Sequence, residues 1–105
     1  MKTHELKILP EFFEAVDKGT KRFELRYNDR DFKQWDFLIL KEWNPEEGKY
    51  TGREIKKRIN YILAGYGGLE KGWVVLGIED YIDAEFLRKH QLMLDILGTP
   101  YFFKL

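Results

Sequence analysis

Two residue types are missing from this chain, and each absence excludes a class of chemistry. Among the 105 residues there is no cysteine, so the protein has neither disulfide bonds nor thiolate ligands for a zinc ribbon. There is also no serine, so neither a Ser-His-Asp triad nor a Cys-His pair can be assembled. With only two histidines, we expect no transition-metal site and no cofactor, and we expect a cytoplasmic protein.

Long apolar runs and net charge are missing as well. No run approaches the roughly 18–20 residues of a membrane-spanning helix, so we expect no membrane association. Eighteen Lys and Arg residues balance eighteen Asp and Glu residues. This neutral net charge argues against a protein that binds nucleic acids non-specifically through a positively charged surface. The chain does have 8 Phe, 6 Tyr and 3 Trp residues. This aromatic content indicates one folded domain.

The spacing of the apolar residues predicts five strands and two helices. We predict strands at 4–9, 21–27, 36–43, 50–63 and 73–79, and helices at 10–18 and 84–97. Pro10 suits a first helical turn, because its missing N–H would be unpaired there anyway, and Gly19 ends that helix. Strands and helices do not alternate in this order. We therefore expect an α+β fold: a small, mostly antiparallel β-barrel with one short N-terminal helix and one C-terminal helix.

Two of the predicted strands have informative side-chain patterns. Residues 21–27 alternate, with Phe23, Leu25 and Tyr27 on one face and Arg22, Glu24 and Arg26 on the other. Charges on a strand usually form a solvated face, so this pattern alone favours an exposed charged row. In 50–63 the residues expected to point inward are Ile55, Ile59, Tyr61 and Leu63. Lys57 interrupts that row, so we expect either a bulge there or an exposed end of the strand.

The stretch from Gly19 to Arg26 reads G-x-K-x-x-E-x-R. This pattern resembles the motif of the ASCH (activating signal cointegrator homology) domain, a relative of the PUA barrel. The flanking residues that add to the resemblance are His4-Glu5-Leu6-Lys7, Phe12-Phe13 and Asn28-Asp29-Arg30-Asp31-Phe32. The resemblance covers residues 3–80 and points to a subfamily of short, mostly uncharacterised bacterial and phage proteins. Where such relatives usually have Gly-Asp before a strand, this chain has Trp35-Asp36.

The resemblance implies a PUA-like barrel at 1–80. Residues 81–105 have no counterpart in the family core, and from their own pattern we expect a helix and an aromatic tail packed on the same single domain. The resemblance also implies a charged cleft beside the first helix that binds RNA or a nucleotide-like ligand. The candidate ligand-binding residues are His4, Lys7, Lys21, Glu24, Arg26, Asn28, Asp29 and Arg30. The cations suit phosphate or carbonyl oxygens, and a glutamate accepts hydrogen bonds from a base edge.

Two alternatives stay open. Some small ASCH relatives are amidohydrolases that deacetylate N4-acetylcytidine with a lysine, a threonine and a glutamate. Lys21 falls on the motif lysine, but Glu24 stands at the position of that threonine. If the chain is such a hydrolase, Lys21 and Glu24 are its catalytic residues. The other alternative is a regulatory protein that contacts a partner, or forms a homodimer, through the helix and tail of 81–105.

Overall fold

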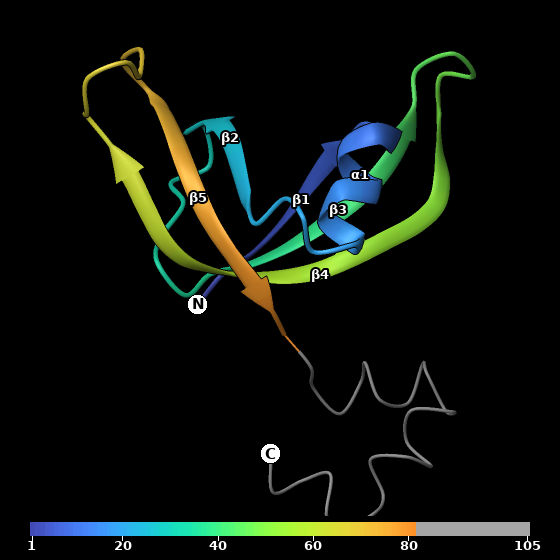
Figure 1. The fold of residues 1–105 in the computed structure, drawn as a ribbon, viewed down its shortest axis with the longest axis horizontal. Coiled ribbons are helices and arrows are strands. Elements are labelled where there is room, and N and C mark those ends of the chain that lie inside the picture. The colour runs from blue at the N-terminus through green and yellow to red at the C-terminus, as the bar shows by residue number, and fades with distance from the viewer. Residues whose placement is uncertain (82–105) are drawn as a thin grey trace, which may run out of the picture.

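The computed structural model describes residues 1–81, in which one five-stranded sheet curls around one helix (Figure 1). In chain order the elements are β1 (Thr3–Ile8), α1 (Pro10–Asp17), β2 (Phe23–Tyr27), β3 (Phe37–Asn44), β4 (Lys49–Ala64) and β5 (Trp73–Asp80). Every boundary lies within two residues of its predicted position, so the predicted order is confirmed over this range. The helix predicted at 84–97 and the tail lie outside the described residues. Within the described range, no helix is long and apolar enough to cross a membrane.

The sheet is a curled half-barrel. Its strand order is β1-β3-β4-β5-β2. The β1–β3 pair is parallel, and the other three pairs are antiparallel, so the sheet is mostly antiparallel as predicted. Residues 1–81 do not close the expected barrel, because β1 and β2 are both edge strands with no ladder between them.

Arginine side chains connect these two edges where backbone pairing is missing. Arg26 of β2 donates from Nη2 to the Lys7 carbonyl of β1 at 2.7 Å. Arg30, just beyond β2, donates from Nη1 to the Glu5 carbonyl of the same strand. We call this line between β1 and β2 the seam. The seam explains how a half-barrel keeps its two edges together.

The apolar core lies between α1 and the inner face of the sheet, so that the helix sits in the hollow of the curl (Figure 1). Pro10 begins α1, and Phe13 and Val16 are the buried residues of the helix. The strands and the loop before β3 supply the rest: Leu6, Ile8, Phe32, Leu38, Leu40, Ile59, Val74, Leu76 and Ile78. Burying one such side chain is worth about 1.5–3 kcal/mol. Burial of Phe13 and Val16 therefore contributes to holding this short helix against the sheet.

The bulge in β4 lies later than the sequence predicted. The β4–β5 register shifts between Ile59 and Tyr61, so the irregularity is at Asn60 and the prediction at Lys57 is wrong. Beyond it the faces exchange: Tyr61 is 63% exposed, while Ile62 packs against the core. The inward row is thus correct at Ile59 and wrong at Tyr61, because one extra residue reverses every later side chain.

Candidate functional site

The charged face of β2 points inward, opposite to what the alternation alone favoured. Glu24 is only 4% exposed, whereas Phe23, Leu25 and Tyr27 are about half exposed. The alternation is confirmed, but the expected solvated face is wrong at its central residue. β2 is an edge strand of the sheet and lies beside α1 and β1. Its inner side therefore meets charged and polar groups as well as the apolar core. A charged row can therefore be accommodated there.

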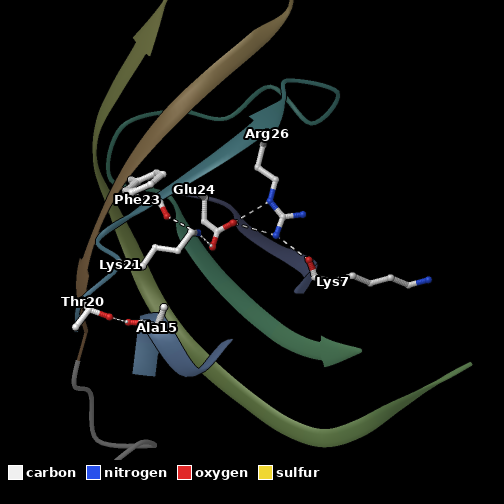
Figure 2. Close-up of polar contacts among 7 residues, drawn as sticks. All are labelled: Lys7, Ala15, Thr20, Lys21, Phe23, Glu24 and Arg26. Atoms are coloured by element: carbon white, nitrogen blue, oxygen red, sulfur yellow. Dashed lines mark hydrogen bonds and ion pairs between the residues drawn. The ribbon is translucent and has the colours of Figure 1, made fainter. Parts of the chain in front are cut away.

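The buried Glu24 carboxylate lies between two cations (Figure 2). Lys21 Nζ is 2.8 Å from Oε1, and Arg26 Nε is 3.2 Å from Oε2. The side chains of the two cations are 16% and 24% exposed. Burying an ion costs several kcal/mol unless it is paired and hydrogen-bonded. Glu24 meets this requirement, because each of its two carboxylate oxygens is hydrogen-bonded to a cation.

The turn after α1 brings Lys21 to this carboxylate. Gly19 has a φ of 79°, a left-handed conformation that glycine adopts without steric cost. The next two backbone N–H groups, those of Thr20 and Lys21, both donate to the Ala15 carbonyl at 3.0 Å. The chain therefore reverses tightly and enters β2 with Lys21 beside Glu24. This turn explains the spacing of glycine, lysine and glutamate in the motif. The glycine allows the chain to reverse, and the reversal places the lysine beside the glutamate.

Each cation also holds the backbone. Lys21 Nζ donates to the Phe23 carbonyl at 2.7 Å, and Arg26 holds the Lys7 carbonyl across the seam. An ammonium has three N–H donors, and residues 1–81 provide oxygen acceptors for two of those on Lys21. The ammonium also lies 5.0 Å from the Phe23 ring and 5.6 Å from the Phe12 ring. One donor is thus left for a ligand, close to two aromatic rings.

A cavity of about 450 Å³ opens beside this cluster. It is lined by Lys7, Ile8, Leu9, Phe12, Lys21, Phe23, Glu24, Leu25 and Arg26. The volume falls within the roughly 300–1,000 Å³ typical of small-molecule sites, and a mostly apolar wall with few polar groups is also typical. We call it the Glu24 cavity. Three of its lining residues are cationic and one is anionic, so it favours an anionic or polar ligand.

No hydroxyl side chain is among these lining residues. Thr20 is the hydroxyl residue nearest to Lys21 in the sequence, and its Oγ1 donates to the Ala15 carbonyl at 3.1 Å (Figure 2). It therefore caps the end of α1 and does not line the cavity. Within residues 1–81, the Lys-Thr-Glu set of the amidohydrolases is not assembled around Lys21.

Of the other predicted site residues, Lys7 lines the cavity, whereas Asn28, Asp29 and Arg30 are not among its lining residues. Lys7 contributes its carbonyl to the seam, while its Nζ lies 3.8 Å from the centre of the Trp43 ring. Arg30 reaches the seam further along β1. Asn28 organises its own loop, because its Oδ1 accepts from the backbone N–H of Phe32 at 3.0 Å. The side chain of Asp29 is 64% exposed and faces Arg30 at 3.7 Å.

His4 lies in the interior, away from the Glu24 cavity. Its Nε2 is 2.8 Å from Asp36 Oδ2, and its ring makes an edge contact with Phe32 at 4.8 Å. Burial alone would raise the pKa of Asp36. The hydrogen bonds from His4 and from the backbone N–H groups of Lys2 and Lys33 outweigh burial and lower that pKa. This pair ties β1 to the start of β3.

A third buried carboxylate, Glu42, was not singled out from the sequence. Arg53 donates to both of its oxygens at 3.0 Å, and the Thr51 hydroxyl donates to one at 2.7 Å. Arg53 also pairs with Glu14 of α1 and stacks 4.3 Å from the Phe13 ring. Hydrogen bonds from Arg53 and then Thr51 lower the pKa of Glu42, and the contact with Glu42 raises that of Arg53. A glutamate inside the apolar β3 could have indicated this pair.

Neither this cluster nor any other in the described part of the chain forms a metal-binding group of three or more His, Cys, Asp or Glu residues.

Comparison with known proteins places this arrangement in a family. Residues 3–78 match the family described as "Domain of unknown function (DUF3850)". The chain belongs to the DUF3850 family. A phage protein, the "Uncharacterized 12.9 kDa protein in GpA 3'region" of Escherichia phage P2, is 43% identical over 58 residues. That alignment covers 55% of this chain and 51% of the phage protein, so the chain matches about half the length of this curated relative. The DUF3850 match includes all of β1 to β4 and most of β5, and with them the Glu24 cavity.

Proposed function

We propose that this DUF3850 protein is a PUA-like module that binds RNA or a nucleotide-like ligand in the Glu24 cavity. One observation carries the proposal: a buried carboxylate held by two different cations forms the wall of a cavity of about 450 Å³. The resemblance of the Gly19–Arg26 stretch to the ASCH motif supports the same cavity as the ligand site.

The chemistry of the wall suits the parts of a nucleotide. Lys21 and Arg26 offer donors to phosphate or carbonyl oxygens. The oxygens of Glu24 accept hydrogen bonds from an amino group or ring N–H of a base. The partly exposed rings of Phe12 and Phe23 offer faces on which a base stacks. Because both charge signs meet in one cavity, the site favours recognition of a single nucleotide over tracking of a long backbone.

A second candidate function is hydrolysis of an acylated cytidine. The observation that favours it is the 2.8 Å pair between Lys21 and Glu24, because a lysine beside a carboxylate can transfer protons in amide hydrolysis. The missing hydroxyl among the lining residues places it second. The third alternative, a protein contact through 81–105, concerns residues outside the described range.

Titration of the full-length protein by NMR, with cytidine 5′-monophosphate and with N4-acetylcytidine, tests both functions at once. We expect amide shifts at Lys21, Glu24 and Arg26. Losing one charged hydrogen bond of about 1.5–3 kcal/mol corresponds to roughly 10- to 100-fold weaker binding. Lys21→Ala and Glu24→Gln should each weaken binding by that factor and keep a folded spectrum.

The matched control is Lys33→Ala, whose 67% exposed side chain pairs with Asp31 away from the cavity. This change should leave the affinity for both ligands unchanged. Release of free acetate from N4-acetylcytidine would decide for the hydrolase. Equal affinities in the wild type, Lys21→Ala and Glu24→Gln would refute binding in the Glu24 cavity.

A further inference from the structure

A second group of cations and aromatic rings lies on the opposite, outer face of the sheet. Lys7 of β1 is paired with Lys41 of β3, and Trp43 of β3 is paired with Tyr50 of β4. Partners in a ladder share one face of a sheet, and buried Leu6 and Leu40 occupy the inner face of the same strands. We call Lys7, Lys41, Trp43 and Tyr50 the outer aromatic cluster.

The members of this cluster are in mutual contact. Lys7 Nζ lies 3.8 Å from the Trp43 ring centre, within the range of a cation–π interaction. The Trp43 and Tyr50 rings meet edge to face at 4.9 Å. Lys41 Nζ lies 5.2 Å from the Tyr50 ring, which is 44% exposed. The rings are therefore fixed in orientation, while one of them keeps an open surface.

One of the two cations of the cluster, Lys7, is open to an anion. Lys41 is paired with Glu5 at 3.2 Å. Lys7, in contrast, has no carboxylate partner among residues 1–81, and its ammonium contacts only aromatic rings there. Its three N–H donors are thus available to a phosphate. A phosphate-binding cation beside an exposed aromatic ring is the combination that proteins use to bind single-stranded nucleic acid.

Lys7 connects this cluster to the Glu24 cavity. Its backbone carbonyl accepts from Arg26 in the cavity wall, while its side chain extends away from Glu24 (Figure 2). The outer aromatic cluster and the cavity therefore lie on the two sides of one residue at the edge of β1. A nucleic-acid strand that extends from the cavity over this edge would meet Lys7 first and Tyr50 next.

We propose that the outer aromatic cluster binds the stretch of single-stranded RNA adjoining the nucleotide held in the Glu24 cavity. Lys7 pairs with a phosphate, and the Tyr50 ring stacks on a base. This inference rests on the proposed nucleotide binding in the cavity. It adds an expectation that the cavity alone does not give: an oligonucleotide binds more tightly than a mononucleotide.

The test compares two ligands on the full-length chain, cytidine 5′-monophosphate and a six-nucleotide oligocytidine RNA, by calorimetry at several salt concentrations. Tyr50→Ala should weaken oligomer binding about fivefold or more, since stacking is worth about 1–3 kcal/mol per base. Lys7→Met keeps the aliphatic stem on Trp43 and removes the charge. It should lower the salt slope for the oligomer by about 0.7, as expected for one lost phosphate contact.

Tyr50→Ala should leave mononucleotide affinity unchanged, because Tyr50 is not among the residues that line the cavity. Lys33→Met, which removes a lysine from the loop before β3, should change the affinity for neither ligand. If Tyr50→Ala and Lys7→Met bind the oligomer like the wild type while Glu24→Gln loses both ligands, the outer aromatic cluster is excluded and the cavity stands. If Glu24→Gln binds both ligands normally, the cavity proposal fails, and this inference fails with it. A lower melting temperature with unchanged oligomer affinity would assign the cluster a structural role only and overturn the inference.

Discussion

Glu24 and Glu42 are both buried glutamates bound by cations, yet their surroundings differ. Glu42 is enclosed by a two-pronged Arg53 contact and a threonine hydroxyl. Glu24 is held from two sides by Lys21 and Arg26, each of which also holds a backbone carbonyl, and it lines a cavity. Burial and charge pairing alone do not separate a binding site from a structural ion pair. The adjacent cavity and the unused donor on Lys21 are the features on which we base the proposal that Glu24, and not Glu42, belongs to a binding site.

The largest expected effect is on stability, and it tests whether the ion pairs of Glu24 and Glu42 differ. Glu42→Gln should lower the free energy of unfolding by about 2 kcal/mol, the scale of hydrogen bonds to a charged group. Glu24→Gln should cost about half as much, because water entering the cavity can solvate Lys21 and Arg26. Urea unfolding followed by tryptophan fluorescence measures both. Equal losses in the two variants would contradict the distinction.

The next expected effect is on the pH dependence of stability. The pKa values of Glu42 and Asp36 lie below their ordinary values of 4.5 and 3.8. The folded protein therefore holds these protons less tightly than the unfolded chain. Their contribution to stability is fully present above the ordinary values and is lost as the pH falls through the folded pKa values. Urea unfolding between pH 7 and pH 3 should show a decline below about pH 4.5 that is smaller in Glu42→Gln. An identical decline in that variant would rule out Glu42 as a source.

The smallest expected effect concerns Trp35, the residue before the buried carboxylate Asp36. Trp35 has a φ of 77°, in the left-handed region that costs a non-glycine residue about 1–2 kcal/mol. Trp35→Gly should therefore be about 1 kcal/mol more stable than Trp35→Ala, since both lack the ring and differ only in this strain. Thermal unfolding of the two variants measures the difference. Equal stability would show that the turn relaxes when the ring is removed.

The sequence predicts the described elements well because their signals are local. Apolar spacing, Pro10 and Gly19 locate β1 to β5 and α1 within two residues. The direction of β2 is not a local property, because alternation alone cannot tell which face meets the hollow of the sheet. The half-barrel is equally non-local, since it depends on the lateral order of strands that lie far apart in the sequence.

The candidate site was predictable in part. The motif spacing identified Lys21, Glu24 and Arg26, which the structure brings together. His4 and Lys7 are close to each other in the sequence but lie on opposite faces of β1, so only their position on a strand could have separated them. The bulge at Asn60 had one usable signal, the glycine inside β5. A Cβ at Gly77 would lie 2.6 Å from Asn60 Oδ1, and a glycine within a strand often marks such a close approach.

The seam has a consequence for self-association. The outward carbonyls of an edge strand are a template on which a foreign strand can add, and natural sheets block that template. Arg26 and Arg30 occupy two of these carbonyls on β1. The same Arg26 guanidinium thus lies in the wall of the Glu24 cavity and occupies a carbonyl at the edge of β1. Replacing Arg26 by a residue that cannot donate a hydrogen bond would therefore change the wall of the cavity and free the Lys7 carbonyl at this edge at the same time.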